Sequence, residues 1–369
     1  MPVDRIRSWL CDSALPLWAG AGFDRQHGGF VERLLADGTP DLDVHKRTMV
    51  QARQIYVYSH AATLGLLPDA SLAEQGFDFL MRHACPDGIQ AGLVHAVTRE
   101  GAIVDATRDT YGHAFFLLAF SWLYRATGSS DARCALDDIA IAIEKLRHLS
   151  GGGYRERDGT VEQCRRQNPH MHLLEAFLAA HAATGNEKFL TRADEIVALF
   201  EGNFFREGML LEFFDDDLRP APAPEGRIVE PGHHHEWVWL LQQYEHARGR
   251  DMSAHRKKLH EATSRHGHDA RSGLVFNEIW ADGSSKDMSK RLWPQTEALK
   301  SGLASGRTLA AMGDNVGRIF HHFLDPAPKG AWIDRLGEDN LPLGGAIPAS
   351  SFYHVFLAFS CYLDGTTGR

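Results

Sequence analysis

The sequence has few cysteines, no long apolar run and no excess of basic side chains. Its five cysteines are scattered and never form a Cys-x-x-Cys pair, which favours reduced thiols in a cytoplasmic protein over a disulfide framework or a zinc ribbon. The longest nearly apolar run, Ala114–Tyr124, is far shorter than the roughly 20 residues that span a bilayer. No apolar segment follows the charged first residues, so we expect neither a secretory signal nor a membrane partner.

Basic residues number 39 against 48 acidic ones, giving a net charge of −9, and they form no cluster. A protein that binds the phosphate backbone needs a basic patch, so we expect no nucleic-acid partner. Proline is concentrated only in residues 220–224, a stretch too short for an interdomain linker. We therefore expect one catalytic domain over residues 1–369, acting as a monomer or a homodimer.

What the sequence does have is a repeat. Helix-like apolar stretches end at a glycine about every 60 residues, and a helical pattern restarts after each one. Glycine just beyond a helix end is the usual left-handed cap. The glycines are Gly65, Gly128, Gly185, Gly249, Gly313 and Gly365. Their spacing predicts an all-α protein, an (α/α)6 barrel of helix hairpins with short β-hairpin loops on one face.

The sequence is also rich in histidine, with 21 residues, and three of them lie near the expected starts of long helices. Pro169 at a first helical position predicts Asn168 as the N-cap, with His172 in the first turns. Pro231-Gly232 predicts a turn with His233 at the mouth of a helix, and His354 follows the Pro-x-Ser start of the last helix. In a ring of hairpins every second helix starts at the same end, so the three histidines are expected to converge.

The run His233-His234-His235 raises the question of a metal. Adjacent residues on a helix diverge by about 100°, so these three side chains do not meet at one ion. Each of the three histidines alone is also compatible with a purely structural role. We predict no metal and no cofactor, and proton transfer by single histidines.

Other polar side chains accompany these helix starts. Arg53 lies in a partly apolar helical pattern, compatible with a salt bridge or with ligand binding. Asp109 is a candidate N-cap with Tyr111 just behind it. Trp293 offers an aromatic face for a sugar, with Glu297 about one helical turn further on.

These segments resemble the N-acylglucosamine 2-epimerase family, which includes mannose isomerases and cellobiose 2-epimerases. The resemblance is carried by Gln51-Ala52-Arg53, Asn168-Pro169-His170-Met171-His172, Glu230-Pro231-Gly232-His233 with Glu236-Trp237, Trp293-Pro294-Gln295-Thr296-Glu297 and Ser351-Phe352-Tyr353-His354. It implies an (α/α)6 barrel with a central sugar pocket. It also implies an acid/base pair at His233 and His354, ring opening at His172, and substrate contacts from Arg53, Tyr111, Asn168, Arg227, Glu236, Trp293 and Glu297.

The chemistry implied is proton transfer at C2 of a reducing sugar through an enediol. Return of the proton to C1 gives a ketose, and its return to the opposite face of C2 gives the epimer. We predict an aldose–ketose isomerase of the mannose/fructose type, with 2-epimerisation of a free or N-acylated aldose as the alternative. A glycosidase using Asp109 with Glu236 or Glu297, and a non-catalytic scaffold, remain open on the sequence alone.

Overall fold

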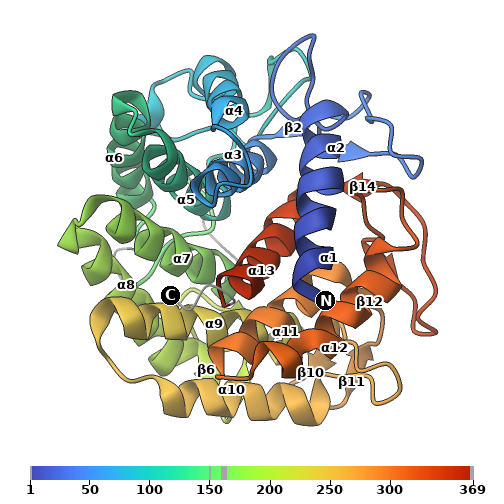
Figure 1. Cartoon of the computed structure of the whole chain (residues 1–369). Helices are drawn as coiled ribbons and strands as arrows, with labels where there is room; N and C mark the ends of the chain where they lie inside the picture. The colour runs from blue at the N-terminus through green and yellow to red at the C-terminus, as the bar shows by residue number, and fades with distance from the viewer. Residues whose placement is uncertain (1, 149–150, 159–163, 366–369) are drawn as a thin grey trace.

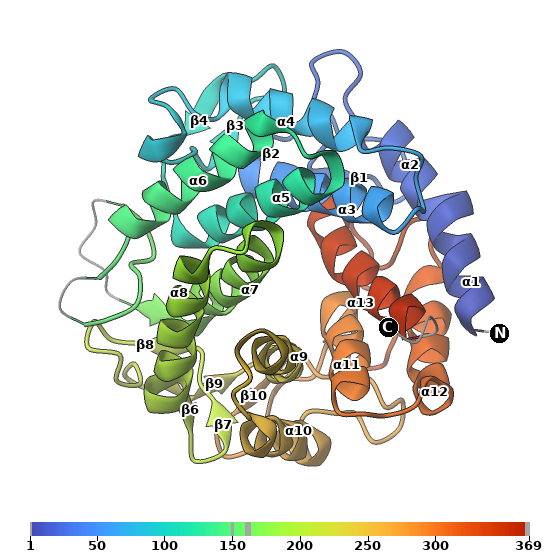
Figure 2. The same ribbon diagram turned by 60° about the vertical axis from the view of Figure 1, so that its left-hand side comes forward.

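The computed structural model, which describes residues 2–148, 151–158 and 164–365, is built mainly from helices (Figure 1). One set of helices surrounds a central axis and is buried on nearly every side (Figure 2). These inner helices are α3 (Thr48–Thr63), α5 (Thr110–Thr127), α7 (Gln167–Thr184), α9 (Pro231–Arg248), α11 (Leu292–Ala304) and α13 (Phe352–Asp364). The apolar run Ala114–Tyr124 lies inside α5, so it forms core.

A second set of helices covers the outside of this ring and buries one face only. It comprises α4 (Ser71–His83), α6 (Ser130–Lys145), α8 (Glu187–Leu199), α10 (Ser253–His266), α12 (Leu309–Ile319), and α1 (Pro2–Trp9) with α2 (Leu15–Gly20). The first helix completes the layer beside the last, where the Trp9 and Phe359 rings meet edge to face at 5.7 Å. The predicted (α/α)6 barrel is confirmed.

Short strands form small antiparallel sheets at one end of the barrel. Their order in these sheets is β1-β14, β2-β3-β4, β5-β8, β6-β7, β11-β10-β9 and β12-β13. The strands are β1 (Arg33–Leu34), β2 (Lys46–Arg47), β3 (Ala96–Val97), β4 (Ile103–Asp105), β5 (Arg165–Arg166), β6 (Phe205–Arg206), β7 (Met209–Leu210), β8 (Phe213–Phe214), β9 (Ile228–Val229), β10 (Glu278–Trp280), β11 (Ser285–Asp287), β12 (Lys290–Arg291), β13 (Arg335–Leu336) and β14 (Ile347–Pro348). β2, β5, β9, β12 and β14 run almost directly into inner helices, and the bridge at Asp109 precedes α5. The inner helices therefore all begin at this end.

The predicted glycine caps are confirmed where they close α5, α7 and α9. Gly128, Gly185 and Gly249 are left-handed C-caps with φ of 68°, 68° and 73°. Gly65 also has a positive φ, one residue beyond the C-cap of α3.

The prediction for Gly313 is wrong, because this residue lies inside α12. The preceding inner helix ends earlier, at Ala304, where Ser305 is the C-cap and Gly306 takes φ 79°. Thr308 then N-caps α12 by accepting from the Ala311 amide. Gly365 follows α13 but is right-handed, with φ −57°.

Two inner helices begin earlier than predicted. α7 starts at Gln167 and α9 at Pro231, so Asn168 is not an N-cap and His233 lies inside the first turn. Their N-caps are the extended residues Arg166 and Glu230, because the strands lead straight into the helices. By contrast, Asp109 caps α5 as predicted, accepting from the Gly112 amide at 2.7 Å.

Within the described part of the chain, no helix combines the length and the apolar character that a membrane crossing requires.

Candidate active site

The barrel axis holds two cavities separated by a layer of buried polar side chains. The cavity at the strand-bearing end has a volume of about 410 Å³ and lies among the first turns of the inner helices. The cavity at the opposite, glycine-capped end is larger, about 790 Å³, and is lined by residues such as His60, Trp122 and Trp239. Glu175 lines this second cavity and accepts a hydrogen bond from the buried Tyr353 hydroxyl. This pair forms part of the floor between the two spaces.

The smaller cavity brings together most of the predicted site residues. Its lining includes Arg53, Tyr111, Asn168, His172, His233, Glu236, Trp293 and His354. Glu297 lies directly behind His354 and is fully buried. Arg227 is not brought to the site: it is half-exposed and pairs with Asp282 at 2.6 Å.

His233 and His354 flank one indole ring. The centroid of the Trp293 ring lies 5.0 Å from that of His233 and 5.5 Å from that of His354. The three side chains come from the first turns of α9, α11 and α13. Two imidazoles distant in the sequence therefore face one small space.

Carboxylates surround His233. Its Nδ1 lies 3.0 Å from Glu212 and 3.8 Å from Glu230. Burial alone lowers the pKa of His233, but the charges of Glu212 and Glu230 outweigh it and raise that pKa to about 10. The raised pKa favours the imidazolium form of His233 at neutral pH. Its Nε2 lies 3.4 Å from the side-chain nitrogen of Asn168, which is itself a donor, so an Nε2 proton has to be donated to a group in the cavity.

A chain of hydrogen bonds holds Glu212 in place. The Trp237 indole donates to the Gln167 side-chain carbonyl at 2.8 Å, and the Gln167 amide then donates to Glu212 at 2.9 Å. The sequence reasoning missed Gln167 and Glu212 as functional residues. Glu212 lies between β7 and β8, where no helix-start pattern marks it.

His354 has the opposite character. Burial lowers its pKa well below the ordinary value, and the cations Arg53 and Lys300 lower it further. Its Nδ1 lies 2.8 Å from a carboxylate oxygen of Glu297, which can accept a proton from Nδ1 of the neutral ring. The other nitrogen, Nε2, is then left as an unprotonated base.

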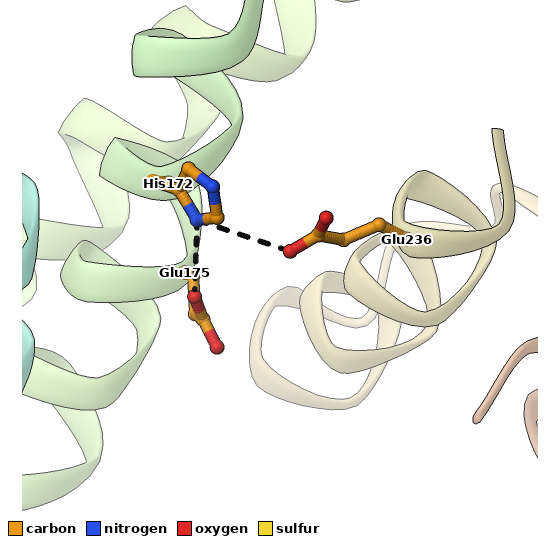
Figure 3. Close-up of side chains that lie close together, drawn as sticks. All are labelled: His172, Glu175 and Glu236. Atoms are coloured by element: carbon orange, nitrogen blue, oxygen red, sulfur yellow. Dashed lines mark hydrogen bonds and ion pairs between the residues drawn. The ribbon is translucent and has the colours of Figure 1, made fainter. Parts of the chain in front are cut away.

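His172, Glu175 and Glu236 form a third group, in which the imidazole on α7 lies between carboxyls of its own helix and of α9 (Figure 3). His172 Nδ1 is 3.5 Å from Glu175 and 3.8 Å from Glu236. Burial lowers the pKa of His172 to about 4, whereas burial and the charge of Glu297 raise the pKa of Glu236 well above its usual range. His172 is thus neutral, and Glu236 is a carboxylic acid that can donate.

The spacing of these groups would also permit a metal ion. His172/Glu175/Glu236, Glu212/Glu230/His233 and Glu236/Glu297/His354 each bring three ligand atoms within 4.8 Å of one another. Several of these atoms already bind protein partners, including the Glu175 oxygen bonded to Tyr353 and the Glu297 oxygen bonded to His354. A cation would have to displace those hydrogen bonds and the proton of Glu236.

Arg53 supplies a buried positive charge at the cavity wall. Its guanidinium donates to Tyr111 Oη at 2.6 Å and to the Ser350 carbonyl at 3.0 Å, and it lies 4.1 Å from the centre of the Phe115 ring. Among the residues that the structure describes, no carboxylate pairs with it. A charge held this way is suited to an anionic oxygen that forms during a reaction.

The carboxylate pair that a glycosidase would need does not assemble around Asp109. This residue caps α5 and lies 2.9 Å from His95, and it is absent from the cavity lining.

Comparisons with known proteins identify the family. The model of the N-acylglucosamine 2-epimerase family matches residues 28–358. A mannose-6-phosphate isomerase of Rhizobium meliloti is 35% identical over 96% of this chain and 94% of its own length. A D-mannose isomerase of Thermobifida fusca is 28% identical over 88% of this chain and 90% of its own.

Solved structures share the fold. The crystal structure of a sugar epimerase from a ruminal bacterium covers 100% of both chains with a TM-score of 0.85 and 22% sequence identity. With a family model matching nearly the whole length, and with paired histidines facing one small polar cavity, the chain belongs to the N-acylglucosamine 2-epimerase family of carbohydrate isomerases and epimerases.

Proposed function

We propose that the protein interconverts an aldose and a ketose of the mannose/fructose type by proton transfer through an enediol. The observation that carries this proposal is the placement of two histidines with different surroundings on either side of Trp293, one beside Glu212 and Glu230 and the other beside Glu297. His354 is a neutral base, and His233 is a cation with a pKa raised to about 10 by Glu212 and Glu230 against the effect of burial. When the surroundings lower the pKa of one group and raise that of its neighbour, the first group can act as the base and the second as the acid.

The reaction begins with opening of the sugar ring. Glu236, held as a carboxylic acid, donates a proton toward a sugar oxygen, and the neutral His172 beside it accepts one from the anomeric hydroxyl. The two groups are 3.8 Å apart, so one can restore the proton of the other. No metal is required for this step.

Proton transfer on carbon follows. His354 Nε2 removes the C2 proton of the open aldose, and the electrons move toward the carbonyl oxygen. The buried guanidinium of Arg53 and the imidazolium of His233 stabilise the developing charge on oxygen. Return of a proton from His354 to C1, with proton movement between the two oxygens, gives the ketose, and exchange of the His354 proton with solvent before its return puts solvent hydrogen on C1.

Isomerisation needs only one base, because the proton that His354 takes from C2 can be returned to C1 on the same face. A 2-epimerase needs in addition a group that gives a proton to C2 on the opposite face. His233, protonated beside Glu212 and Glu230, is in the right state to do so, and its charge therefore does not separate the two outcomes. The 2-epimerase alternative remains the competing outcome, because the family also contains epimerases.

We propose a free monosaccharide as substrate. Two arginines at the cavity, Arg47 and Arg291, are already opposed by the carboxylates of Glu32 and Asp334. Arg53, the remaining arginine of the cavity lining, has no carboxylate partner among the described residues, but the proposed reaction uses it for the developing oxyanion, which leaves no arginine of the lining free for a phosphate. The R. meliloti relative is named for a phosphorylated sugar, so mannose 6-phosphate is the comparison substrate.

The test is incubation of mannose and of mannose 6-phosphate in D2O, followed by NMR. We expect free mannose to give fructose, with deuterium at the carbons that exchange. Glucose without fructose would establish the 2-epimerase instead. Conversion of the phosphorylated sugar alone would overturn the substrate assignment. The His354→Asn variant is the control and should give neither product nor exchange.

A further inference from the structure

Lys300 is a fully buried cation close to the catalytic cavity but outside its lining. It lies on α11, one turn after Glu297, and its Nζ is 2.7 Å from the Oε2 of that carboxylate. Its ammonium also lies 4.3 Å from the centre of the Trp239 ring. Burying an ammonium is costly, so its retention here calls for a specific partner.

The partner, Glu297, connects Lys300 to His354. One carboxylate oxygen faces the ammonium, and the other accepts from His354 Nδ1 at 2.8 Å. Glu297 is completely buried, and burial raises the pKa of its carboxyl. Lys300 is therefore the neighbour that most favours the ionised form of Glu297.

Other groups also act on this carboxylate. Charged or titratable side chains come from every neighbouring inner helix: Arg53 on α3, His172 and Glu175 on α7, His233 and Glu236 on α9, and His354 on α13. The nearby carboxyls oppose ionisation of Glu297, while the imidazolium of His233 supports it. Without Lys300 the balance shifts toward a protonated Glu297.

We propose that Lys300 is a positioning residue that keeps Glu297 ionised and so fixes His354 as the tautomer with hydrogen on Nδ1 and a free Nε2. A protonated Glu297 would donate to Nδ1 instead. The ring hydrogen would then move to Nε2, and the base would be lost from the cavity. This inference rests on the proposed role of His354 as the base.

The experiment compares Lys300→Met with Lys300→Arg. For Lys300→Met we expect kcat to fall by about 10- to 100-fold, as for loss of groups that orient a catalytic histidine, with little change in KM. In a plot of kcat against pH, the acidic limb should move to higher pH, because without Lys300 the Glu297 carboxyl loses its proton only at higher pH. Lys300→Arg keeps the charge and should restore much of kcat and the original limb.

A second readout does not require activity. The 15N shifts of His354 should show hydrogen on Nδ1 in the wild type and in Lys300→Arg, and on Nε2 in Lys300→Met. Lys46→Met is the matched control, since it removes another buried ammonium, one paired with Asp24 and remote from Glu297. It should leave the tautomer and the pH profile unchanged.

These outcomes separate two kinds of failure. An unchanged His354 tautomer in folded Lys300→Met, or an acidic limb that stays in place, would overturn the role of Lys300. If the wild type is inactive on every aldose but the expected tautomer change is present in Lys300→Met, the proposed function is overturned and the role of Lys300 stands. Should Lys300→Met not fold, a shifted tautomer in Lys300→Arg would itself contradict the proposal.

Discussion

At the scale of single residues, identical side chains acquire different chemistry from their neighbours. His233 faces Glu212 and Glu230, whereas His354 faces one carboxylate and lies near two cations. Activity should require His233 charged and His354 neutral. We therefore expect kcat to stay level through pH 6.5, where an ordinary histidine titrates, and to fall as pH rises through about 10, the raised pKa of His233. Turnover of mannose between pH 5 and 10.5 measures this. Burial raises the pKa of Glu230, beside His233, to about 7, so the contradicting result is a limb near pH 6.5 that persists in Glu230→Gln.

Glu212→Gln tests the cause of that raised pKa. Removing the carboxylate takes away the largest influence that opposes burial, while Glu230 and Glu236 remain, so the pKa of His233 should fall and the basic limb should move to lower pH. At pH 9 we expect kcat to drop by about tenfold or more, the loss expected from one orienting carboxylate. Asp216→Asn is the control, because Asp216 pairs with His148 near the surface. An unmoved limb in Glu212→Gln would show that Glu212 does not set the charge of His233.

The sequence allowed prediction of the residues on helix starts but not of those that tune them. His172, His233 and His354 could be placed together because hairpin repeats align alternate helix ends. Glu212 comes from a β-loop, and its contact with His233 depends on how that loop folds back over the barrel. Arg227 was misplaced for the same reason, since its loop directs it to Asp282.

At the scale of elements, the glycine caps set where inner helices stop. Gly185 has φ 68° and nothing within 4 Å of an added Cβ, so backbone strain alone opposes a substitution. Gly185→Ala should lower the free energy of unfolding by about 1–2 kcal/mol. Gly20→Ala, at a helical glycine that also has open space, should be neutral or stabilising by about 0.5 kcal/mol. Urea denaturation measures both, and equal effects would contradict the strain argument.

The cap pattern predicted most of the ring but failed for Gly313, and Gly365 closes α13 without the left-handed conformation. Gly313 follows an apolar stretch, yet α12 continues through it, and the true stop is at Ser305-Gly306. A glycine at a helix end and one within a helix look alike when only their spacing is considered. The N-cap Thr308, two residues after Gly306, is the local signal that separates the two cases.

At the scale of the whole molecule, contacts between the two ends of the chain close the ring. β1 pairs with β14, and α1 packs against α13. Because this closure is non-covalent, we expect the ring to form as well when the chain begins at another hairpin, provided that the cyclic order of the hairpins is kept.

A circular permutant tests this. Its ends would be joined by a Gly/Ser linker, and the chain would be opened between the exposed residues Gly306 and Arg307. We expect cooperative unfolding, mannose turnover and a loss below about 2 kcal/mol, the scale of loop-closure changes. A permutant opened between the buried Leu117 and Leu118 of α5 should fail to fold. If neither permutant folds, the idea that non-covalent contacts alone close the ring is contradicted.

The buried Tyr353–Glu175 pair closes the catalytic cavity on the side of the second cavity. With no passage there, aldose and ketose have to occupy the same small space in turn, so we expect fructose to inhibit the conversion of mannose competitively. Initial rates of mannose conversion at several fructose concentrations measure this, and a mixed pattern of inhibition would contradict it.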